Sequence, residues 1–317
     1  MKLIKQFTIN FAQSNCNNQE IKMSNWIFAI RPKTLFASIA PVILGLTVAY
    51  LHQNFLNPLI ALLTLICALL MQIASNLAND YLDSLKGIDT DKRLGPLRVT
   101  HAGLIPASTM RNALIIVLAL AFLMGLYLMW VGGIVIVIIG LLSLYFAYGY
   151  TGGPFPLSHN GLGEVAAFIF FGVIAVSGTT YLQIHQFSPL ALLLGMGPGF
   201  ISATVLAVNN LRDIQSDTET NKRTIAVRFG ENFQRKLCLF LISASSIVLF
   251  MVAYLFNYTW LIPAGFLPLL FISNWIKIAK DPIDKSLNNA LAKTAQYLLL
   301  YCIIASLCLL QSSGKIL

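Results

Sequence analysis

The chain has 317 residues, of which 57% are hydrophobic and only 10% are charged. Soluble domains carry about 25% charged residues, so this composition excludes a soluble globular protein and favours one embedded in a bilayer. The net charge of +9 could indicate a nucleic-acid partner, but the placement of the basic residues along the chain argues against one.

Apolar segments recur along the chain at lengths that suit a membrane-spanning helix, which needs about 20 residues to cross the hydrocarbon core. Nine such segments lie at approximately residues 36–51, 58–78, 112–130, 132–149, 162–182, 189–210, 237–256, 259–276 and 296–311. We therefore predict an all-α membrane protein with about nine transmembrane helices around a central cavity. Residues 1–23 are rich in Asn and Gln and lack the apolar stretch of a signal peptide. We predict a disordered cytoplasmic tail there and one transmembrane domain over residues 24–317.

The basic residues fall almost entirely on one side once the chain is threaded through nine spans. Loops after the first, third, fifth and seventh spans contain no Lys or Arg, and Lys315 is the only basic residue on their side. Cytoplasmic loops of membrane proteins carry the excess of Lys and Arg. This asymmetry predicts a multi-pass protein of the inner (plasma) membrane with a cytoplasmic N-terminus, whose basic residues meet lipid and substrate and not nucleic acid.

Acidic residues gather in two cytoplasmic loops, at about residues 79–111 and 211–236. Each loop is entered through the pattern Asn-x-x-x-Asp, followed three or four residues later by another Asp. The two sets are Asn76, Asp80, Asp83 and Asn209, Asp213, Asp217. Both follow the second helix of a four-helix set, which predicts two parallel four-helix repeats related about the membrane normal. The ninth span is then one extra helix.

The two acidic stripes predict a metal and diphosphate site. Positions i, i+3 and i+4 share a helix face, and two carboxylate stripes facing each other would repel unless cations lay between them. Mg²⁺ takes oxygen ligands and commonly binds through carboxylates and substrate phosphates. Arg98, Lys222 and Arg223 lie in tight loops beside the stripes and suit phosphate oxygens. The alternative is that the acids meet solvent and the cations fix the topology and meet anionic lipid.

At these residues the chain resembles a known family. The segments Asn79-Asp80-Tyr-Leu-Asp83-Ser-Leu-Lys-Gly87-Ile-Asp89 and Asn209-Asn-Leu-Arg212-Asp213-Ile-Gln-Ser-Asp217 resemble the two aspartate motifs of the UbiA superfamily of prenyltransferases. Three further segments agree with it: Arg31-Pro-Lys33-Thr34, Tyr150-Thr-Gly-Gly-Pro154 and Gly161-Leu-Gly163-Glu164. The Gly87-Ile-Asp89 form is similar to the 1,4-dihydroxy-2-naphthoate prenyltransferase branch, because the broader superfamily usually has a further Asp where Gly87 stands.

The resemblance implies a role for each matching residue, with Mg²⁺ as the cofactor and an isoprenoid diphosphate as the donor. Asp80, Asp83, Asp213 and Asp217 would be the catalytic acids. The implied metal ligands are these four together with Asn79, Asp89 and Asn209, and it stays open whether Asp89 or Asp91 completes the set. Arg98, Lys222 and Arg223 would bind the diphosphate, and Arg31, Lys33 and Tyr150 the aromatic acceptor.

The implied reaction transfers a polyprenyl or phytyl group from its diphosphate to 1,4-dihydroxy-2-naphthoate. Loss of CO₂ and diphosphate would give demethylmenaquinone or the phylloquinone precursor. A prenyltransferase with another aromatic acceptor, such as 4-hydroxybenzoate, is the alternative within the same class. A transporter is more distant, because it predicts ionisable residues near the middle of the membrane, and none of the twelve acids lies in the middle of a span.

Overall fold

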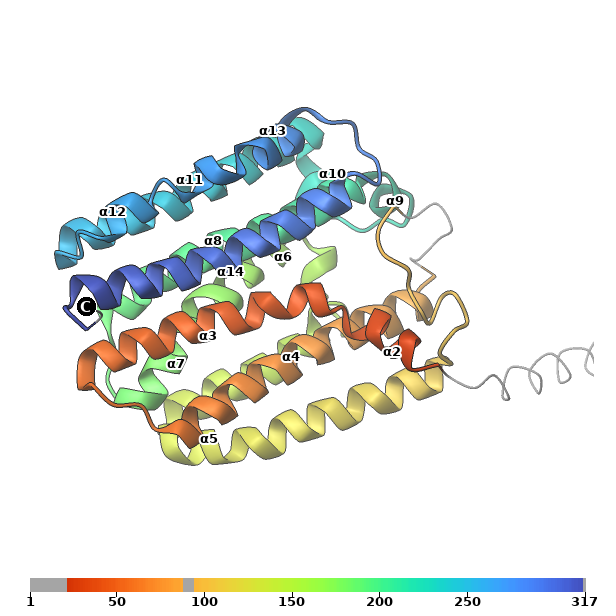
Figure 1. Ribbon diagram of the computed structural model, residues 1–317. Helices are drawn as coiled ribbons and strands as arrows, with labels where there is room; N and C mark the ends of the chain where they lie inside the picture. The colour runs from red at the N-terminus through yellow and green to blue at the C-terminus, as the bar shows by residue number, and fades with distance from the viewer. Residues whose placement is uncertain (1–21, 88–93, 316–317) are drawn as a thin grey trace, which may run out of the picture.

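The computed structural model describes residues 22–87 and 94–315, and every regular element within these ranges is a helix. Figure 1 shows them as one bundle of roughly aligned helices. In chain order they are α2 (Met23–Ile30), α3 (Pro32–Gln53), α4 (Pro58–Leu85), α5 (Ala107–Gly149), η1 (Leu157–His159), α6 (Gly163–Phe168), η2 (Ile169–Ile174), α7 (Ala175–Ile184), α8 (Pro189–Arg212), α9 (Ile214–Glu219), α10 (Ile225–Phe229), α11 (Glu231–Phe256), α12 (Leu261–Ala264), η3 (Leu267–Phe271), α13 (Ile272–Lys280) and α14 (Leu287–Ser312).

Eight helical stretches in the described part of the chain are long and apolar enough to cross a membrane. Two of them are composite: α6, η2 and α7 form one span, and α12, η3 and α13 form another. Helices satisfy all of their backbone hydrogen bonds internally, as a lipid environment requires. The predicted all-α membrane fold is confirmed.

The difference between eight stretches and nine predicted spans arises in α5, which has 43 residues. A straight helix of that length would measure about 64 Å, about twice the hydrocarbon thickness. Gly133 interrupts it with a non-helical backbone (φ 63°, ψ −157°). A methyl group placed on Gly140 would lie 2.5 Å from Cε of Met129, although eleven helical residues span about 16 Å. Helix α5 therefore folds back on itself at Gly133 and supplies the third and fourth predicted spans.

The packing follows the predicted repeat. Helix α4 packs extensively against α5, and α8, its counterpart in the second half, packs extensively against α11. The span that contains η2 crosses α8 at small residues: a methyl group on Gly172 would lie 2.3 Å from Cα of Gly199 and 2.5 Å from the carbonyl oxygen of Gly195. Glycines at such crossings let two membrane helices approach closely. The extra helix α14 packs against both α3 and α8, so it joins the two halves.

The polar connections gather at one end of the bundle. Figure 1 shows α2, α9 and α10 at that end and the labelled C-terminus at the opposite end. The predicted disordered tail lies, up to residue 21, outside the described residues and stays a prediction; helix α2 begins at Met23. The fold therefore brings the predicted site residues together at one end of the membrane-spanning helices.

The hairpin at Gly133 can be tested by substitution. Its backbone lies in a region that is nearly exclusive to glycine, so we expect Gly133→Ala to lower the free energy of unfolding by about 1–3 kcal/mol. A new methyl group there would meet no atom within 4 Å, which isolates the backbone effect. Thermal unfolding in detergent is the measurement.

Gly125→Ala is the control: it lies in a helical part of α5 with equally open space, and it should be neutral or stabilising by about 0.5–1 kcal/mol. Equal melting temperatures for the two variants would contradict the hairpin.

Candidate active site

A cavity of about 820 Å³ runs from the polar end into the apolar interior of the bundle. Its polar end is lined by Asn79, Asp83, Arg98, Asn209 and Lys222, and its far end by Thr64, Cys67, Leu128, Met129, Ile136 and Leu182. Thr64 and Asp83 both lie on α4, 19 residues apart, which corresponds to about 28 Å along the helix axis. The cavity thus joins a charged entrance to an apolar channel nearly as long as the membrane core is thick.

The two aspartates of the first motif have different partners. Asp80 is almost fully buried and accepts the backbone N–H groups of Val99 (3.1 Å) and Thr100 (2.9 Å). These hydrogen bonds fix the loop that precedes α5. Asp83 faces the cavity, and its Oδ2 lies 3.1 Å from Nη2 of Arg98. Asp80 therefore holds the loop, and that loop places the Arg98 guanidinium on Asp83.

The two aspartates of the second motif also have different partners. Arg212, with only 2% of its surface exposed, donates from Nε and Nη2 to the two oxygens of Asp213 at 2.8 and 2.6 Å. Its Nη2 also donates to Oδ1 of Asn209 at 2.8 Å. Asp217 lies one turn further on, with its Oδ1 3.5 Å from Nζ of Lys222. Asp213 anchors the buried arginine, while Asp217 is paired with a cation that lines the cavity.

The structure brings most of the predicted site residues to one cavity. Those that line it are Arg31, Lys33, Asn79, Asp83, Arg98, Tyr150, Asn209 and Lys222. Asp80, Asp213 and Asp217 are buried beside it. Arg223 is exposed and does not line it, and its backbone N–H donates to the carbonyl of His159. Asp89 and Asp91 lie outside the described residues.

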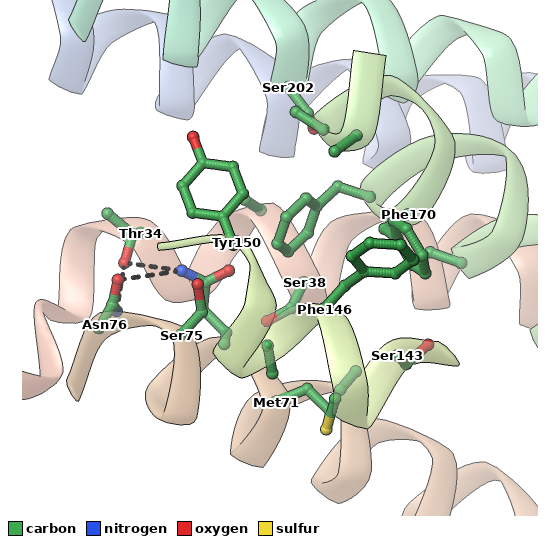
Figure 2. A pocket seen from close by; sticks show the side chains of 18 of the residues that line it. Thr34, Ser38, Met71, Ser75, Asn76, Ser143, Phe146, Tyr150, Phe170 and Ser202 are labelled. Carbon is green, nitrogen blue, oxygen red and sulfur yellow. Dashed lines mark hydrogen bonds between the residues drawn. The ribbon is translucent and has the colours of Figure 1, made fainter. Parts of the chain in front are cut away.

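The predicted acceptor residues lie where α2 meets α3. Arg31 stands between these helices in the left-handed conformation (φ 55°), which is uncommon for a residue other than Gly, Asn or Asp and is concentrated at functional sites. The side chain of Asn76 holds this break by donating to the carbonyl of Ile30 (2.7 Å) and to the hydroxyl of Thr34 (2.9 Å). Figure 2 shows the pair Asn76 and Thr34 at the cavity wall. The first Asn of the motif thus shapes the acceptor side of the cavity.

Aromatic rings form part of the cavity wall, where Figure 2 labels Tyr150, Phe146 and Phe170. The rings of Phe146 and Phe170 have their centroids 5.2 Å apart and are tilted by 57° to each other. An apolar aromatic lining of this kind suits an aromatic ligand and excludes water.

Carboxylates of both aspartate motifs affect the pKa of the Tyr150 phenol. Burial is the main cause that raises its pKa, and the carboxylates of Glu164, Asp83 and Asp217 raise it further. A neutral phenol is therefore kept beside the carboxylates at physiological pH, and it can donate a hydrogen bond.

The residues at the entrance fit a divalent cation that is completed by substrate. Among residues 22–87 and 94–315, no group of three or more His, Cys, Asp or Glu side chains forms a ready-made metal cage. Mg²⁺ does not require one, because it usually binds through one or two carboxylates, waters and phosphates. Oδ1 of Asp83 is buried and accepts no hydrogen bond within the described residues, and a buried carboxylate oxygen without a partner is unfavourable. A cation beside this oxygen would remove that penalty.

Sequence reasoning missed three residues of the site. His159 lies beside the entrance, Thr151 donates its hydroxyl to the side-chain oxygen of Asn79, and Asn288 on α14 lines the cavity. Neither His159 nor Asn288 has a spacing that marks a ligand, and α14 was expected to be an extra helix. The Tyr150-Thr-Gly-Gly segment was singled out, but its sequence did not show that Thr151 contacts the first motif.

The histidine gives a pH prediction. Burial and the nearby ammonium groups of Lys86 and Lys222 lower the pKa of His159 to about 4, compared with about 6.5 in an unfolded chain. The unfolded chain therefore takes up a proton between these values that the folded protein does not, so the free energy of unfolding falls as the pH falls through this window. Thermal unfolding at about pH 7 and about pH 5 should show a smaller acid-induced loss of Tm for His159→Gln than for the wild type. Equal losses would contradict this environment.

Comparisons with known proteins agree with this geometry. The model of the UbiA prenyltransferase family matches residues 38–310. The chain is 42% identical over 233 residues to a 1,4-dihydroxy-2-naphthoate octaprenyltransferase of Escherichia coli (strain K12), covering 71% of this chain and 75% of the relative. It is 38% identical over 233 residues to a protein of the same name from Mycobacterium leprae (strain TN), covering 73% and 78%.

Solved structures show the same fold. The structure of a UbiA homolog from Archaeoglobus fulgidus bound to DMAPP and Mg²⁺ aligns with a TM-score of 0.66 and 16% identity, over 90% of this chain and 99% of that one. The helical bundle, the paired aspartate motifs and the matched family model agree. The chain belongs to the UbiA prenyltransferase family.

Proposed function

We propose that the protein transfers a polyprenyl group from its diphosphate to 1,4-dihydroxy-2-naphthoate, the step that gives demethylmenaquinone. The observation that carries the proposal is the single cavity with a charged entrance and an apolar channel, lined by residues of both aspartate motifs. The relatives that are 42% and 38% identical bear the name of this activity. The positive-inside asymmetry supports an entrance on the cytoplasmic face of the plasma membrane.

The diphosphate of the donor would lie at the entrance. Arg98 offers a guanidinium that is held in place by Asp83, and Lys222 offers an ammonium that is held by Asp217. Arginine gives paired donors to phosphate oxygens and lysine a point charge. The exposed Arg223 would reach the diphosphate only from outside the cavity, so we assign the main contacts to Arg98 and Lys222.

Mg²⁺ would be held by Asp83 and Asp217, with Asn79 and Asn209 as neutral oxygen ligands. When bound, it neutralises the leaving diphosphate and acts as a Lewis acid. Asp80 and Asp213 would support this site through the loop and the arginine that they hold. Asp89 remains a candidate ligand from the sequence alone.

The hydrocarbon tail would extend along the channel toward Thr64 and Leu128. Burying apolar surface in such a channel contributes about 0.8 kcal/mol per methylene group. The apolar walls would also keep water away from the allylic carbon while its C–O bond breaks, which protects the developing cation from hydrolysis.

The acceptor would lie between the aromatic wall and the α2–α3 break. Arg31 and Lys33 line this region and carry the charge that an aromatic carboxylate requires, and Tyr150 can donate a hydrogen bond. In the reaction, the ring carbon that bears the carboxylate forms a C–C bond to the allylic carbon, and the allylic C–O electrons leave with diphosphate. The bond to the carboxylate then breaks, its electrons restore the aromatic ring, and CO₂ departs.

The fate of the carboxyl group tests this function. With carboxyl-labelled 1,4-dihydroxy-2-naphthoate and a polyprenyl diphosphate, we expect one labelled CO₂ for each prenylated product. The measurement is trapped label against product by mass spectrometry, with 4-hydroxybenzoate offered in parallel. A prenylated product that keeps the label, or reaction with 4-hydroxybenzoate alone, would overturn the naphthoate assignment.

The joint role of the two motifs is tested by removing charge without changing size. Asp83→Asn and Asp217→Asn should each lower kcat by at least about 100-fold, and the double variant should be little worse, because residues that act as one unit are not additive. Asp284→Asn, at an exposed position outside the cavity, is the control and should retain wild-type activity. Additive losses in the double variant would separate the two motifs.

A further inference from the structure

Helix α14 takes part in the site although the repeat leaves it outside both halves. Its first turn places Asn288 in the cavity wall, and Leu291 and Ala292 follow on the same side. The remainder of the helix packs against α3 and α8. At this helix a single side chain can therefore contact the polar loops of both halves.

The amide of Asn288 makes both of these contacts. Its Nδ2 donates to the carbonyl of Leu94 at 2.8 Å, and its Oδ1 accepts from Nη1 of Arg212 at 2.8 Å. Leu94 belongs to the loop that carries Arg98, and Arg212 is the arginine that holds Asp213 and Asn209. The NH₂ group and the oxygen of one side-chain amide thus join the loop of the first motif to the second motif.

The loop that carries Arg98 is held at two places. Asp80 accepts the N–H groups of Val99 and Thr100 on one side of Arg98, and Asn288 holds Leu94 on the other. The segment between these anchors lines the cavity through Pro96 and Arg98. If the Leu94 anchor is lost, the part of the loop before Arg98 loses its hydrogen bond to α14, and the Arg98 guanidinium is less well fixed over the entrance.

The hydrogen bond from Arg212 to Asn288 is important because Arg212 is buried. A guanidinium removed from water needs hydrogen-bond acceptors for its N–H groups, and an unfilled position on a buried charge is strongly unfavourable. Asp213 takes two of these hydrogen bonds, Asn209 one and Asn288 one. Asn288 therefore helps to set the orientation in which Arg212 presents Asp213 and Asn209.

We infer that Asn288 is a positioning residue that holds the Arg98 loop and the Arg212–Asp213 pair in register, so that the two halves bind one diphosphate together. This inference rests on the proposed function of the entrance as a diphosphate site. It assigns to the extra helix a part in donor binding, because the two hydrogen bonds of Asn288 go to the loop that carries Arg98 and to Arg212.

Two substitutions at this position test the two hydrogen bonds: one removes the bond to Leu94, and the other removes both bonds. Asn288→Asp keeps an oxygen that accepts the hydrogen bond from Arg212. It replaces the NH₂ group that donates to Leu94 with a carboxylate oxygen, which the Leu94 carbonyl repels. The new carboxylate also competes with Asp213 for the guanidinium. Asn288→Ser is smaller and uncharged and removes both contacts. We expect each variant to raise the KM for the prenyl diphosphate and the Mg²⁺ concentration for half-maximal rate by about tenfold, because each breaks a hydrogen bond between the halves and leaves a polar group without its partner. The KM for the naphthoate should stay within about twofold of wild type.

The matched control is Asn289→Asp, which adds the same charge at the next position of α14, where the side chain is exposed. It should leave both KM values unchanged. Limited trypsin digestion gives a readout without turnover: cleavage after Arg98, which is only 7% exposed, should be faster in both Asn288 variants than in the wild type and the control.

Two kinetic results would overturn the inference: equal KM values for the prenyl diphosphate in the Asn288 and Asn289 variants, or an equal rise of the KM for the prenyl diphosphate and for the naphthoate. Loss of folded protein in both Asn288 variants would also overturn it, because it would show a role in stability alone. Failure of the wild type to prenylate the naphthoate would instead remove the proposed function. The rate of cleavage after Arg98 would still decide whether Asn288 holds the loop.

Discussion

The pairing of buried carboxylates with fixed donors is the interaction on which the site depends. Four aspartates are buried at one end of the bundle, where unpaired charge would be highly unfavourable. Asp80 is stabilised by hydrogen bonds from backbone N–H groups and Asp213 by a buried guanidinium. Asp80 fixes an element beside Asp83, and Asp213 fixes one beside Asp217. The cations paired with Asp83 and Asp217 face the cavity. Within each motif, one aspartate thus holds neighbouring structure and the other is paired with a cation at the cavity.

The membrane explains the rest of the architecture. A diphosphate needs a charged, water-accessible pocket, whereas its tail needs an apolar one, and a channel that begins at a helix end and continues between the helices provides both. Small residues let the span containing η2 approach α8 closely, while Phe146, Tyr150 and Phe170 give the cavity an aromatic lining (Figure 2). The hairpin at Gly133 returns α5 toward the entrance, so that Tyr150 and Thr151 reach the first motif.

Much of this arrangement could be predicted from the sequence, because apolar length, charge asymmetry and the Asn-x-x-x-Asp patterns are local signals. They predicted the spans and the end at which the site lies, and most of the predicted site residues line the cavity or are buried beside it. The division of labour between Asp80 and Asp83 could not be predicted, because it depends on where the loop backbone at Val99 turns. The participation of Asn288 was missed for the same reason: an Asn beside a second Asn at the start of an apolar helix has no pattern, and its partners lie 194 and 76 residues away.

The central claim is that Asp83 and Asp217 bind the metal while Asp80 and Asp213 support them. The most direct measurement is the anomalous scattering of Mn²⁺ in crystals of the protein grown with a non-reactive thio-analogue of a prenyl diphosphate. We predict Mn²⁺ at about 2.1 Å from oxygens of Asp83 and Asp217, with the analogue completing its shell and Asp80 still bonded to Val99 and Thr100. Mn²⁺ bound by Asp80 or Asp213 with their present hydrogen bonds broken, or bound away from both motifs, would contradict the account.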